Sequence, residues 1–274
     1  MQSAFYNEFR RLRGRGLSNL MRMTFHRIAY EALDICNALE MATLESAVVI
    51  TSLEPGARTL DIGSGNGAVA IRLAERFGFR VEAVELDPGM VELARSRIAG
   101  SASRGQIILH ETRSDQVLEA AGPFDLIVAL GVTEPVGDGI RDPRGMFDGL
   151  KQHLTPDGWL LWGDMVWLAE PSAPLKQLVE LTNTYADHEG WQTTAREAGF
   201  KVVTADVSSP ELWNRYRATM QDAVEAWLEA NPDHPDAASI RSRAHQLKLM
   251  FDFGEGTLGF GLYLLHNPRS SSEA

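Results

Sequence analysis

The sequence predicts a doubly wound α/β fold built on a mostly parallel sheet. Two observations support this prediction. Short β-branched runs alternate with amphipathic stretches of helical length through the middle of the chain, and a glycine-rich turn follows the first of these runs. Parallel strands separated by helix-length segments need crossover connections, which place helices on both faces of the sheet.

The alternation begins after residue 57 and gives the expected elements in order. The expected strands are residues 58–62, 80–84, 106–110, 124–130 and 159–162, and the expected helices between them are residues 68–77, 90–98 and 146–154. The last third departs from this rhythm. Residues 201–207 and 257–265 read as strands, and a helical pair at about residues 209–255 is inserted between them as a cap on one edge of the sheet.

The segment before the first strand is predicted to be helical. From Phe25 to Ala42, apolar residues recur at steps of three and four, which is the spacing of one helix face. We expect this helix to run to the break at Glu54-Pro55-Gly56. The predicted organisation is therefore a helical lead-in or lid at residues 1–54, followed by one domain at residues 55–274.

Composition and charge exclude several classes of protein. The chain of 274 residues carries 37 acidic and 26 basic side chains, a net charge of −11, which argues against a general nucleic-acid or anionic-membrane surface. Its one cysteine, Cys36, rules out an internal disulfide. The histidines show no ligand-like spacing, so no metal is expected. Without an apolar run near 18 residues or a signal-peptide pattern, we expect a soluble, cytoplasmic protein.

A glycine-rich turn between the first strand and its helix is the most informative segment. It reads Asp61-Ile62-Gly63-Ser64-Gly65-Asn66-Gly67, and with Ala68 it satisfies the pattern G-x-G-x-x-G/A. The second strand ends about twenty residues later at Glu85, whose carboxylate can accept both hydroxyl protons of a ribose. The sequence therefore predicts a cofactor that contains adenosine.

The neighbours of the turn bear on which cofactor binds. A carboxylate at Asp61 would repel a pyrophosphate but suits a cationic amino-acid group. The chain has no Tyr-x-x-x-Lys pair of the kind that short-chain dehydrogenases use. A nicotinamide-dependent oxidoreductase remains an alternative because of the glycine pattern. A non-catalytic cofactor-binding protein remains another, because no residue is certain to act as a catalytic base.

The residues at the turn resemble a known family. The run from Asp61 to Gly67, followed by Glu85, is similar to the first two motifs of class I S-adenosylmethionine (SAM)-dependent methyltransferases. The likeness covers residues 55–165, through Phe124–Ala129 and Leu154–Trp159, and residues 213–233 resemble bacterial small-molecule methyltransferases of the ubiquinone-methylase-like superfamily. It implies SAM as cofactor and a Rossmann-like sheet of seven strands with an antiparallel last strand.

The resemblance also implies roles for the cofactor-binding residues. Asp61 and the backbone at Gly63 and Gly65 would hold the methionine end, Glu85 the ribose, and Leu86 would flank the adenine. The remaining members of the expected cofactor set are Ser64, Asn66, Gly67, Thr112, Arg113, Leu130 and Gly131. Arg113 stands where many members place an Asp that meets the adenine amino group. Arginine cannot accept a hydrogen bond, so Thr112, Ser114 or a backbone carbonyl would do so.

The acceptor side is less clearly marked. The candidate catalytic residues are His26, Glu134, Asp164 and Trp167, each of which a structural role explains equally well. Large aromatic residues in the cap favour an aromatic or apolar small molecule as acceptor, although packing also explains them. No nucleic-acid or membrane partner is expected. RNA methylation is a further alternative, because residues 1–30 carry six arginines and one acid.

Overall fold

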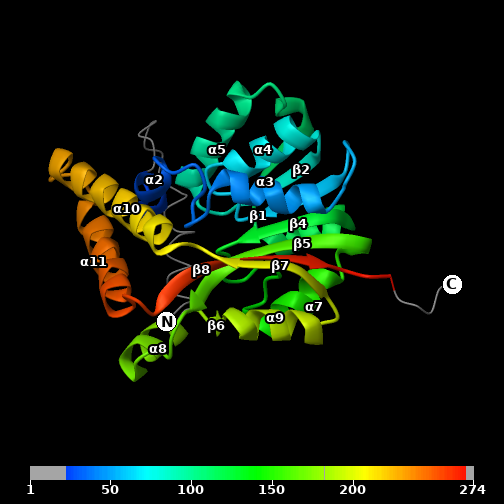
Figure 1. Ribbon diagram of the computed structural model, residues 1–274. Coiled ribbons are helices and arrows are strands. Elements are labelled where there is room, and N and C mark those ends of the chain that lie inside the picture. Colours follow the sequence, from blue (N-terminus) through cyan, green and yellow to red (C-terminus); the bar gives the residue numbers. More distant parts are fainter. Residues whose placement is uncertain (1–22, 182, 270–274) are drawn as a thin grey trace.

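The computed structural model of the chain describes residues 23–181 and 183–269 and shows a mixed sheet between two layers of helices (Figure 1). The sheet follows the order β3-β2-β1-β4-β5-β8-β7. These strands are β1 (Arg58–Ile62), β2 (Arg80–Glu85), β3 (Ile107–Glu111), β4 (Phe124–Leu130), β5 (Leu154–Trp167), β7 (Lys201–Val207) and β8 (Leu258–His266). The first five are parallel, and β8 is antiparallel to both β5 and β7.

The predicted sheet is therefore confirmed, with one addition. A two-residue strand, β6 (Ala186–Asp187), pairs with the end of β5 and was not expected. The order of the parallel strands reverses between β1 and β4, because β2 and β3 lie on one side of β1 and β4 and β5 on the other. In open α/β sheets the crevice at such a reversal, at the carboxyl ends of the strands, is where ligands bind.

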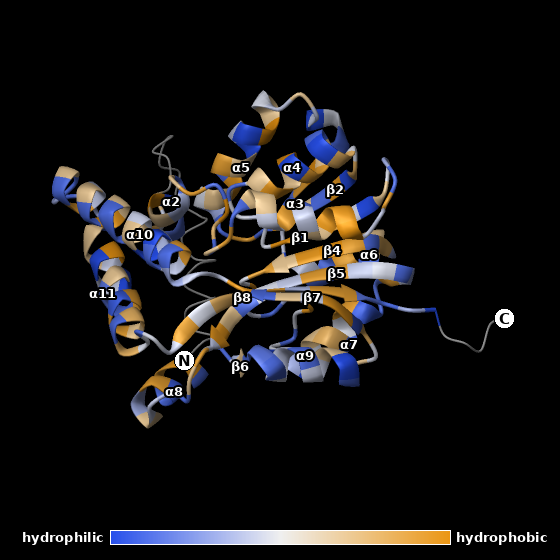
Figure 2. Ribbon diagram, in the orientation of Figure 1, coloured by the Kyte–Doolittle hydropathy of each residue, from blue (hydrophilic) through white to orange (hydrophobic). Residues whose placement is uncertain are grey.

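Helices cover both faces of the sheet, as the alternation predicts. One face carries α3 (Met41–Ile50), α4 (Ala68–Phe77) and α5 (Pro88–Gly100), and the other carries α6 (Ser114–Ala121), α7 (Pro143–Lys151) and α9 (His188–Glu197) (Figure 1). Helix α4 packs on the sheet through one apolar side, where its buried residues recur at Val69, Ala70, Leu73 and Ala74. Strand β4 lies between the two helical layers and is almost entirely apolar (Figure 2), as expected of a strand buried on both faces.

A second group of helices gathers at the end of the sheet where the parallel strands finish (Figure 1). It consists of α2 (Phe25–Tyr30), α8 (Ala173–Glu180), α10 (Pro210–Ala230) and α11 (Ala237–Phe253). Helix α10 packs against α2, α11 and β8. Its buried side chains recur at helical spacing, at Trp213, Tyr216, Met220 and Val224. The expected helical pair is thus present, and it lies over the carboxyl ends of the strands.

The expected continuous helix before the first strand is wrong. Helix α2 ends at Tyr30 and α3 begins at Met41, and the ten residues between them are not helical. The side chain of Asn66 donates to the carbonyls of Leu33 (2.8 Å) and Asp34 (3.2 Å), and that of Asn37 donates to the carbonyl of Leu130 (3.2 Å). The two bonds from Asn66 occupy backbone carbonyls that a helix over residues 31–40 would otherwise use. Residues 1–22, with most of the basic arm, lie outside the described residues.

The fifth strand is also longer than expected. Residues 163–167 were expected to follow the strand, but β5 continues to Trp167 because Asp164, Met165 and Val166 pair with β8. Antiparallel pairing with a distant strand is invisible to local patterning. Within the described ranges, none of the helices has the length and apolar character that crossing a bilayer requires.

Candidate active site

The turn after β1 strongly favours glycine at three positions. Gly63, Gly65 and Gly67 have φ values of +66°, +56° and +78°, a region that other residues rarely adopt. Space is equally restrictive, since a Cβ on Gly65 would lie 3.0 Å from Sγ of Cys36, and one on Gly63 would lie 2.8 Å from Cγ2 of Val132. The chain therefore passes unusually close to its neighbours here.

Beside this turn, at the carboxyl ends of β1, β2 and β4, the structure has a cavity of about 370 Å³. It contains most of the residues that the sequence singled out. Those that line it are His26, Gly63, Gly65, Glu85, Leu86, Thr112, Arg113, Leu130, Gly131 and Glu134. Six of the predicted residues do not line the cavity: Asp61 in β1, Ser64, Asn66 and Gly67 in the turn itself, and Asp164 and Trp167 in β5.

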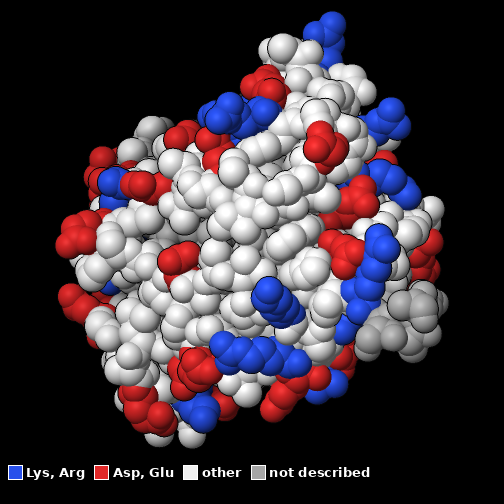
Figure 3. Space-filling model, turned by 45° about the vertical axis from the view of Figure 1, so that its right-hand side comes forward, with Lys and Arg blue, Asp and Glu red and all other residues white. Residues whose placement is uncertain are grey.

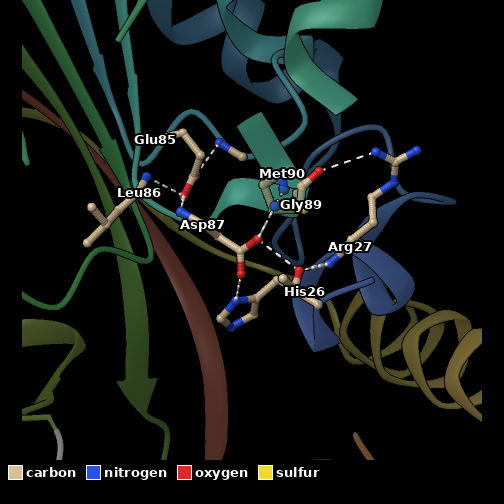
Figure 4. Close-up of polar contacts among 9 residues, drawn as sticks. His26, Arg27, Glu85, Leu86, Asp87, Gly89 and Met90 are labelled. Atoms are coloured by element: carbon tan, nitrogen blue, oxygen red, sulfur yellow. Dashed lines mark hydrogen bonds and ion pairs between the residues drawn. The ribbon is translucent and has the colours of Figure 1, made fainter. Parts of the chain in front are cut away.

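Glu85 is held at the mouth of the turn by backbone N–H groups (Figure 4). Its Oε2 accepts a hydrogen bond from Gly65 N (2.9 Å), and its Oε1 accepts from Leu86 N (2.7 Å) and Asp87 N (2.8 Å). Burial raises the pKa of Glu85, although these three bonds act in the opposite direction. The carboxylate is thus preset beside the cavity, with lone pairs left for hydroxyl donors.

Asp61, at the start of the turn, has a buried carboxyl group with one unpaired oxygen. Its side chain is 3% exposed, and Oδ2 has no hydrogen-bond partner among the described residues. Burial, followed by the negative charge of Glu85, raises the pKa of Asp61 to about 8, against the lowering effect of the Ala70 N–H. An unpaired buried carboxylate is costly, so a cation brought close to it would be strongly favoured. Ser64 Oγ, in the same turn, is also buried without a partner.

Asp87 fastens helix α2 to the start of α5 (Figure 4). Its Oδ1 accepts from Thr24 Oγ1 (2.8 Å) and from the N–H groups of Gly89 (2.9 Å) and Met90 (3.1 Å), while Oδ2 lies 3.1 Å from Nδ1 of His26. Burial alone would raise the pKa of Asp87, but the bonds from His26 and Thr24 outweigh it and lower the pKa. The sequence analysis missed Asp87, although Asp before Pro88 is a typical helix start.

The segment after β3 reaches the cavity through Thr112, Arg113 and Ser114. The guanidinium of Arg113 binds the carboxylate of Asp115 at 2.8 Å, which lowers the pKa of Asp115. The hydroxyl of Thr112 donates to the side chain of Gln116. Arg113 therefore acts as a hydrogen-bond donor to Asp115. Ser114 is buried and contributes a hydroxyl to this side of the cavity.

The four candidate catalytic residues separate into two pairs. His26 and Glu134 line the cavity, and Oε1 of Glu134 accepts two bonds from Arg141, at 2.7 and 2.6 Å. Asp164 and Trp167 do not line it. Burial raises the pKa of Asp164 to about 7, opposed by a bond from Met165 N to Oδ1 (2.7 Å). The indole N–H of Trp167 donates to the carbonyl of Tyr185 at 3.1 Å.

The cavity also has lining residues that the sequence analysis missed. Tyr30, Cys36 and Asn37 come from the segment expected to be one helix, and they enter the lining because that segment unwinds after Tyr30. Burial raises the pKa of Cys36 to about 12, so its side chain stays a neutral thiol. No local signal marks these positions, since their placement depends on the long-range bonds of Asn37 and Asn66.

Comparison with known proteins identifies the family. The model of a methyltransferase domain matches residues 37–205, more than half of the chain. The chain is 27% identical to the uncharacterized protein YjhP of Escherichia coli (strain K12) over 222 residues, which are 79% of this chain and 87% of YjhP. It is 34% identical over 106 residues to a ubiquinone biosynthesis O-methyltransferase of Xylella fastidiosa (strain 9a5c), 38% of this chain and 40% of that protein.

A third relative modifies RNA. Over 140 residues, 48% of this chain and 58% of the relative, the identity to a tRNA1(Val) (adenine(37)-N6)-methyltransferase of Aeromonas hydrophila is 39%. The chain thus spans about half of the length of this relative and of the O-methyltransferase.

Solved structures show the same fold. A SAM-dependent methyltransferase from Thiobacillus denitrificans, in complex with S-adenosyl-L-homocysteine (SAH), superimposes with a TM-score of 0.75 at 24% identity, covering 90% of this chain and 99% of that one. The corresponding complex from Geobacter sulfurreducens gives a TM-score of 0.74 at 23% identity, covering 90% and 99%. The likeness therefore covers nine-tenths of this chain and almost all of each of the two structures.

The residues at the cavity fit SAM. The unpaired buried oxygen of Asp61 suits the ammonium of its methionine end, and a Cβ at Gly63 or Gly65 would crowd the close passage of the turn. A nicotinamide dinucleotide would instead bring a pyrophosphate toward Asp61. The match to a methyltransferase family also favours SAM over a nicotinamide dinucleotide. The chain belongs to the class I SAM-dependent methyltransferases, and SAM is its methyl donor.

Proposed function

We propose that this methyltransferase acts on a small molecule that reaches the cavity beneath α2 and the cap formed by α10 and α11. The observation that carries the proposal is the cover over the cavity: His26 and Tyr30 of α2 line it, and α10 packs on α2 from outside. In this proposal residues 23–54 act as a lid on the domain at residues 55–274. Such a cover favours small compounds over macromolecular surfaces, because an acceptor has to pass beneath it to reach the cofactor.

Each end of the cofactor has candidate residues in this proposal. Asp61 binds the methionine ammonium, directly or through water, and the N–H groups of the turn at Gly63–Gly67 approach the same end. Glu85 accepts the ribose hydroxyls. Leu86, whose side chain is 60% exposed, flanks the adenine together with the wall formed by Thr112, Arg113 and Ser114. Leu130 and Gly131 lie under the cofactor.

When bound, SAM supplies a methyl group already activated by its sulfonium. The protein then needs to align the acceptor and exclude water, and it needs a base only for an acceptor that arrives protonated. Of the two candidate bases that line the cavity, Glu134 is paired with Arg141, whereas His26 is held through Nδ1 by Asp87. We therefore place His26 ahead of Glu134 as the candidate base.

The relative that methylates tRNA makes RNA a second candidate acceptor. The charge distribution argues against it. On the face shown in Figure 3, acidic and basic side chains are interspersed without a continuous basic area, and the whole chain carries −11. RNA binding normally needs a positive surface and weakens steeply with added salt.

Two measurements test the proposal. Calorimetric titration with SAH and, separately, with NAD is expected to show binding of SAH alone. Transfer from methyl-labelled SAM is then followed into a metabolite extract and into a bulk tRNA fraction at low salt. Label in low-molecular-weight products supports a small-molecule acceptor. Label confined to tRNA contradicts the proposal and favours RNA methylation.

A further inference from the structure

The lining of the cavity has two sources. The residues that hold SAM in the proposed function come from the ends of the parallel strands and the turns that follow them, at Gly63, Gly65, Glu85, Leu86, Leu130 and Gly131. The cover contributes His26 and Tyr30 of α2 and Cys36 of the segment after it. With SAM held on the strand ends, the side left for the acceptor is the cover. The titratable groups of the cover are therefore the candidates for taking a proton from the acceptor.

Only one of these groups can act as a base near neutral pH. Burial is the main cause that raises the pKa of Tyr30, and it raises the pKa of Cys36 to about 12, so both side chains stay protonated. Glu134, which follows β4, has its Oε1 bound twice by Arg141. Among the described residues that the cover contributes to the lining, the imidazole of His26 is therefore the remaining candidate. Imidazole is also the side chain that most often serves as a general base.

Asp87 holds that imidazole through one of its two ring nitrogens (Figure 4). Oδ2 of Asp87 lies 3.1 Å from Nδ1 of His26, and both residues line the cavity. The imidazole is stacked on the ring of Tyr30, with 5.7 Å between the centroids and 16° between the planes, and it meets the ring of Phe25 edge-on at 5.9 Å. One hydrogen bond and two ring contacts thus fix the orientation of the imidazole.

The charge state of Asp87 decides which nitrogen of His26 carries the hydrogen. Burial alone would raise the pKa of Asp87, but the hydrogen bonds from His26 and Thr24 outweigh it and lower the pKa, so the carboxyl group is ionised at neutral pH. A carboxylate only accepts hydrogen bonds, so Nδ1 of the neutral ring is the donor and Nε2 keeps the lone pair. Nε2 has no hydrogen bond from the described residues, and the His26 side chain is 44% exposed. The lone pair can therefore accept a proton from a molecule in the cavity.

We propose that Asp87 is a positioning residue that fixes His26 as the general base of the methyl transfer, and that the acceptor is a small molecule with a hydroxyl group. This inference rests on the proposed function and adds to it the role of Asp87 and the class of acceptor. The hydrogen bond between Nδ1 and Oδ2 carries it. That bond selects the tautomer, and it stabilises the imidazolium ion that forms when Nε2 takes the proton.

The charge balance of the reaction links such a base to a hydroxyl acceptor. The oxygen attacks the methyl carbon, the C–O bond forms as the C–S bond breaks, and the bonding electrons stay on sulfur as SAH leaves. The hydroxyl proton passes to Nε2 of His26 and is later lost to solvent. A phenol, with a pKa of about 10, is only about 0.1% ionised at pH 7 and so needs this base. A neutral amine attacks with its own lone pair, and a carboxylate arrives ionised, so neither needs a base during the transfer.

The first test identifies the atom that receives the methyl group. The full chain is incubated with a metabolite extract and SAM whose methyl carbon is isotope-labelled, and the NMR chemical shift of the transferred methyl group shows which atom carries it. We expect methylation of a hydroxyl oxygen. Methylation only of nitrogen, sulfur, carbon or a carboxylate oxygen overturns the inference and leaves the proposed function intact. Absence of any labelled small-molecule product refutes the proposed function itself.

Asp87→Asn tests the positioning role with little change in shape. Thr24 Oγ1, Gly89 N and Met90 N all donate to Oδ1 of Asp87, so the amide oxygen of Asn takes that place and its NH2 group takes that of Oδ2. The NH2 group then donates to Nδ1 of His26 and moves the ring hydrogen to Nε2, which can no longer accept a proton. We expect kcat for the O-methylated acceptor to fall at least about tenfold, with KM and SAH affinity within about threefold of the parent. His26→Gln should lower kcat at least about a hundredfold.

The tautomer of His26 can be measured without any acceptor. NMR of the histidine ring nitrogens at pH 8 distinguishes the two tautomers, and His26→Gln identifies the signals of His26 by their loss. We expect the hydrogen on Nδ1 in the parent and on Nε2 in Asp87→Asn. A purely structural role for Asp87 would not produce this reversal. A hydrogen on Nε2 in the parent overturns the inference.

A second histidine–carboxylate pair provides the matched control. The side chain of Glu82 is hydrogen-bonded to that of His110, and neither residue lines the cavity. Glu82→Gln should therefore leave kcat unchanged. Equal losses of kcat in Glu82→Gln and Asp87→Asn, or an unchanged kcat in Asp87→Asn or His26→Gln, would count against the proposed roles of Asp87 and His26.

Discussion

The carboxylate of Glu85 accepts a hydrogen bond from the backbone N–H of Gly65, with 2.9 Å between Oε2 and N. This bond joins the ends of two neighbouring strands, β1 and β2, across the mouth of the cofactor cavity. It positions the acid before any ligand arrives, so little ordering remains to be done on binding.

Replacing Glu85 should weaken cofactor binding through two effects. In Glu85→Gln an amide replaces an acceptor that serves three N–H groups, so one donor faces another or the side chain turns away. We expect SAH affinity, measured by calorimetry, to fall at least about tenfold, the range for hydrogen bonds to charged groups. Glu82→Gln is the control, because Glu82 lies on the same strand but binds His110. Equal effects of both substitutions would contradict this role.

Cofactor binding should release protons from Asp61. Its pKa of about 8 leaves much of the unliganded protein protonated there at pH 7. The ammonium of SAH favours the carboxylate and lowers this pKa, so binding expels up to one proton. Titrations at pH 7 in buffers of different ionisation enthalpy measure the release. The proton release should vanish in Asp61→Asn. The SAH affinity of this variant should also fall at least about tenfold. Binding without proton release in the parent would refute this coupling.

The unliganded protein should lose stability as the pH rises from about 4 to 8. Asp61 and Asp164 have raised pKa values of about 8 and 7 in the folded state, so folding favours their protonated forms. Their contribution is complete below the ordinary pKa of a carboxyl and is lost as pH rises through the folded values. Asp61→Asn should be less sensitive, by at least about 1 kcal/mol between pH 5 and 8. Denaturant titrations at both pH values test this.

Alanine at Gly65 should be far more damaging than at an open glycine. Gly65→Ala combines a strained φ of +56° with a Cβ only 3.0 Å from Sγ of Cys36. Gly256→Ala is the matched control, because its φ is +70° and nothing lies within 4 Å of the added Cβ. The control should cost about 1–2 kcal/mol from strain alone. Gly65→Ala should cost more in thermal unfolding and should abolish SAH binding. Equal losses would refute the steric argument.

Asp87 should stabilise α2 beyond its role as a helix cap. Asp87→Ala removes the cap of α5, worth about 1–2 kcal/mol, and also the contacts with Thr24 and His26. We expect amide exchange in residues 24–30 to quicken. Asp142→Ala is the control, because it removes only the hydrogen bond from Gly145 N that caps the start of α7. It should leave the amide exchange of residues 24–30 unchanged. Because the Asp87 pKa is lowered, the parent should keep this protection at neutral pH and lose it as the pH falls through that lowered value.

Short-range patterns were sufficient for the framework of the cofactor site. The alternation of strands and helices predicted β1, β4, β7 and α4 at their observed bounds, and the run from Asp61 to Gly67 with Glu85 indicated the cofactor. These signals are local because backbone sterics, side-chain periodicity and glycine conformation act within a few residues. The positions of Asp61, Gly65 and Glu85 relative to one another follow directly from a parallel βαβ unit.

Only the tertiary structure decided what covers the site and what faces the acceptor. Residues 31–40 are not helical: the side chain of Asn66 binds the carbonyls of Leu33 and Asp34, that of Asn37 binds the carbonyl of Leu130, and Tyr30 lines the cavity. Asp164 lies inside a strand because β8 returns to pair with it. Such contacts join segments up to about a hundred residues apart, and their energies depend on packing that no local pattern contains.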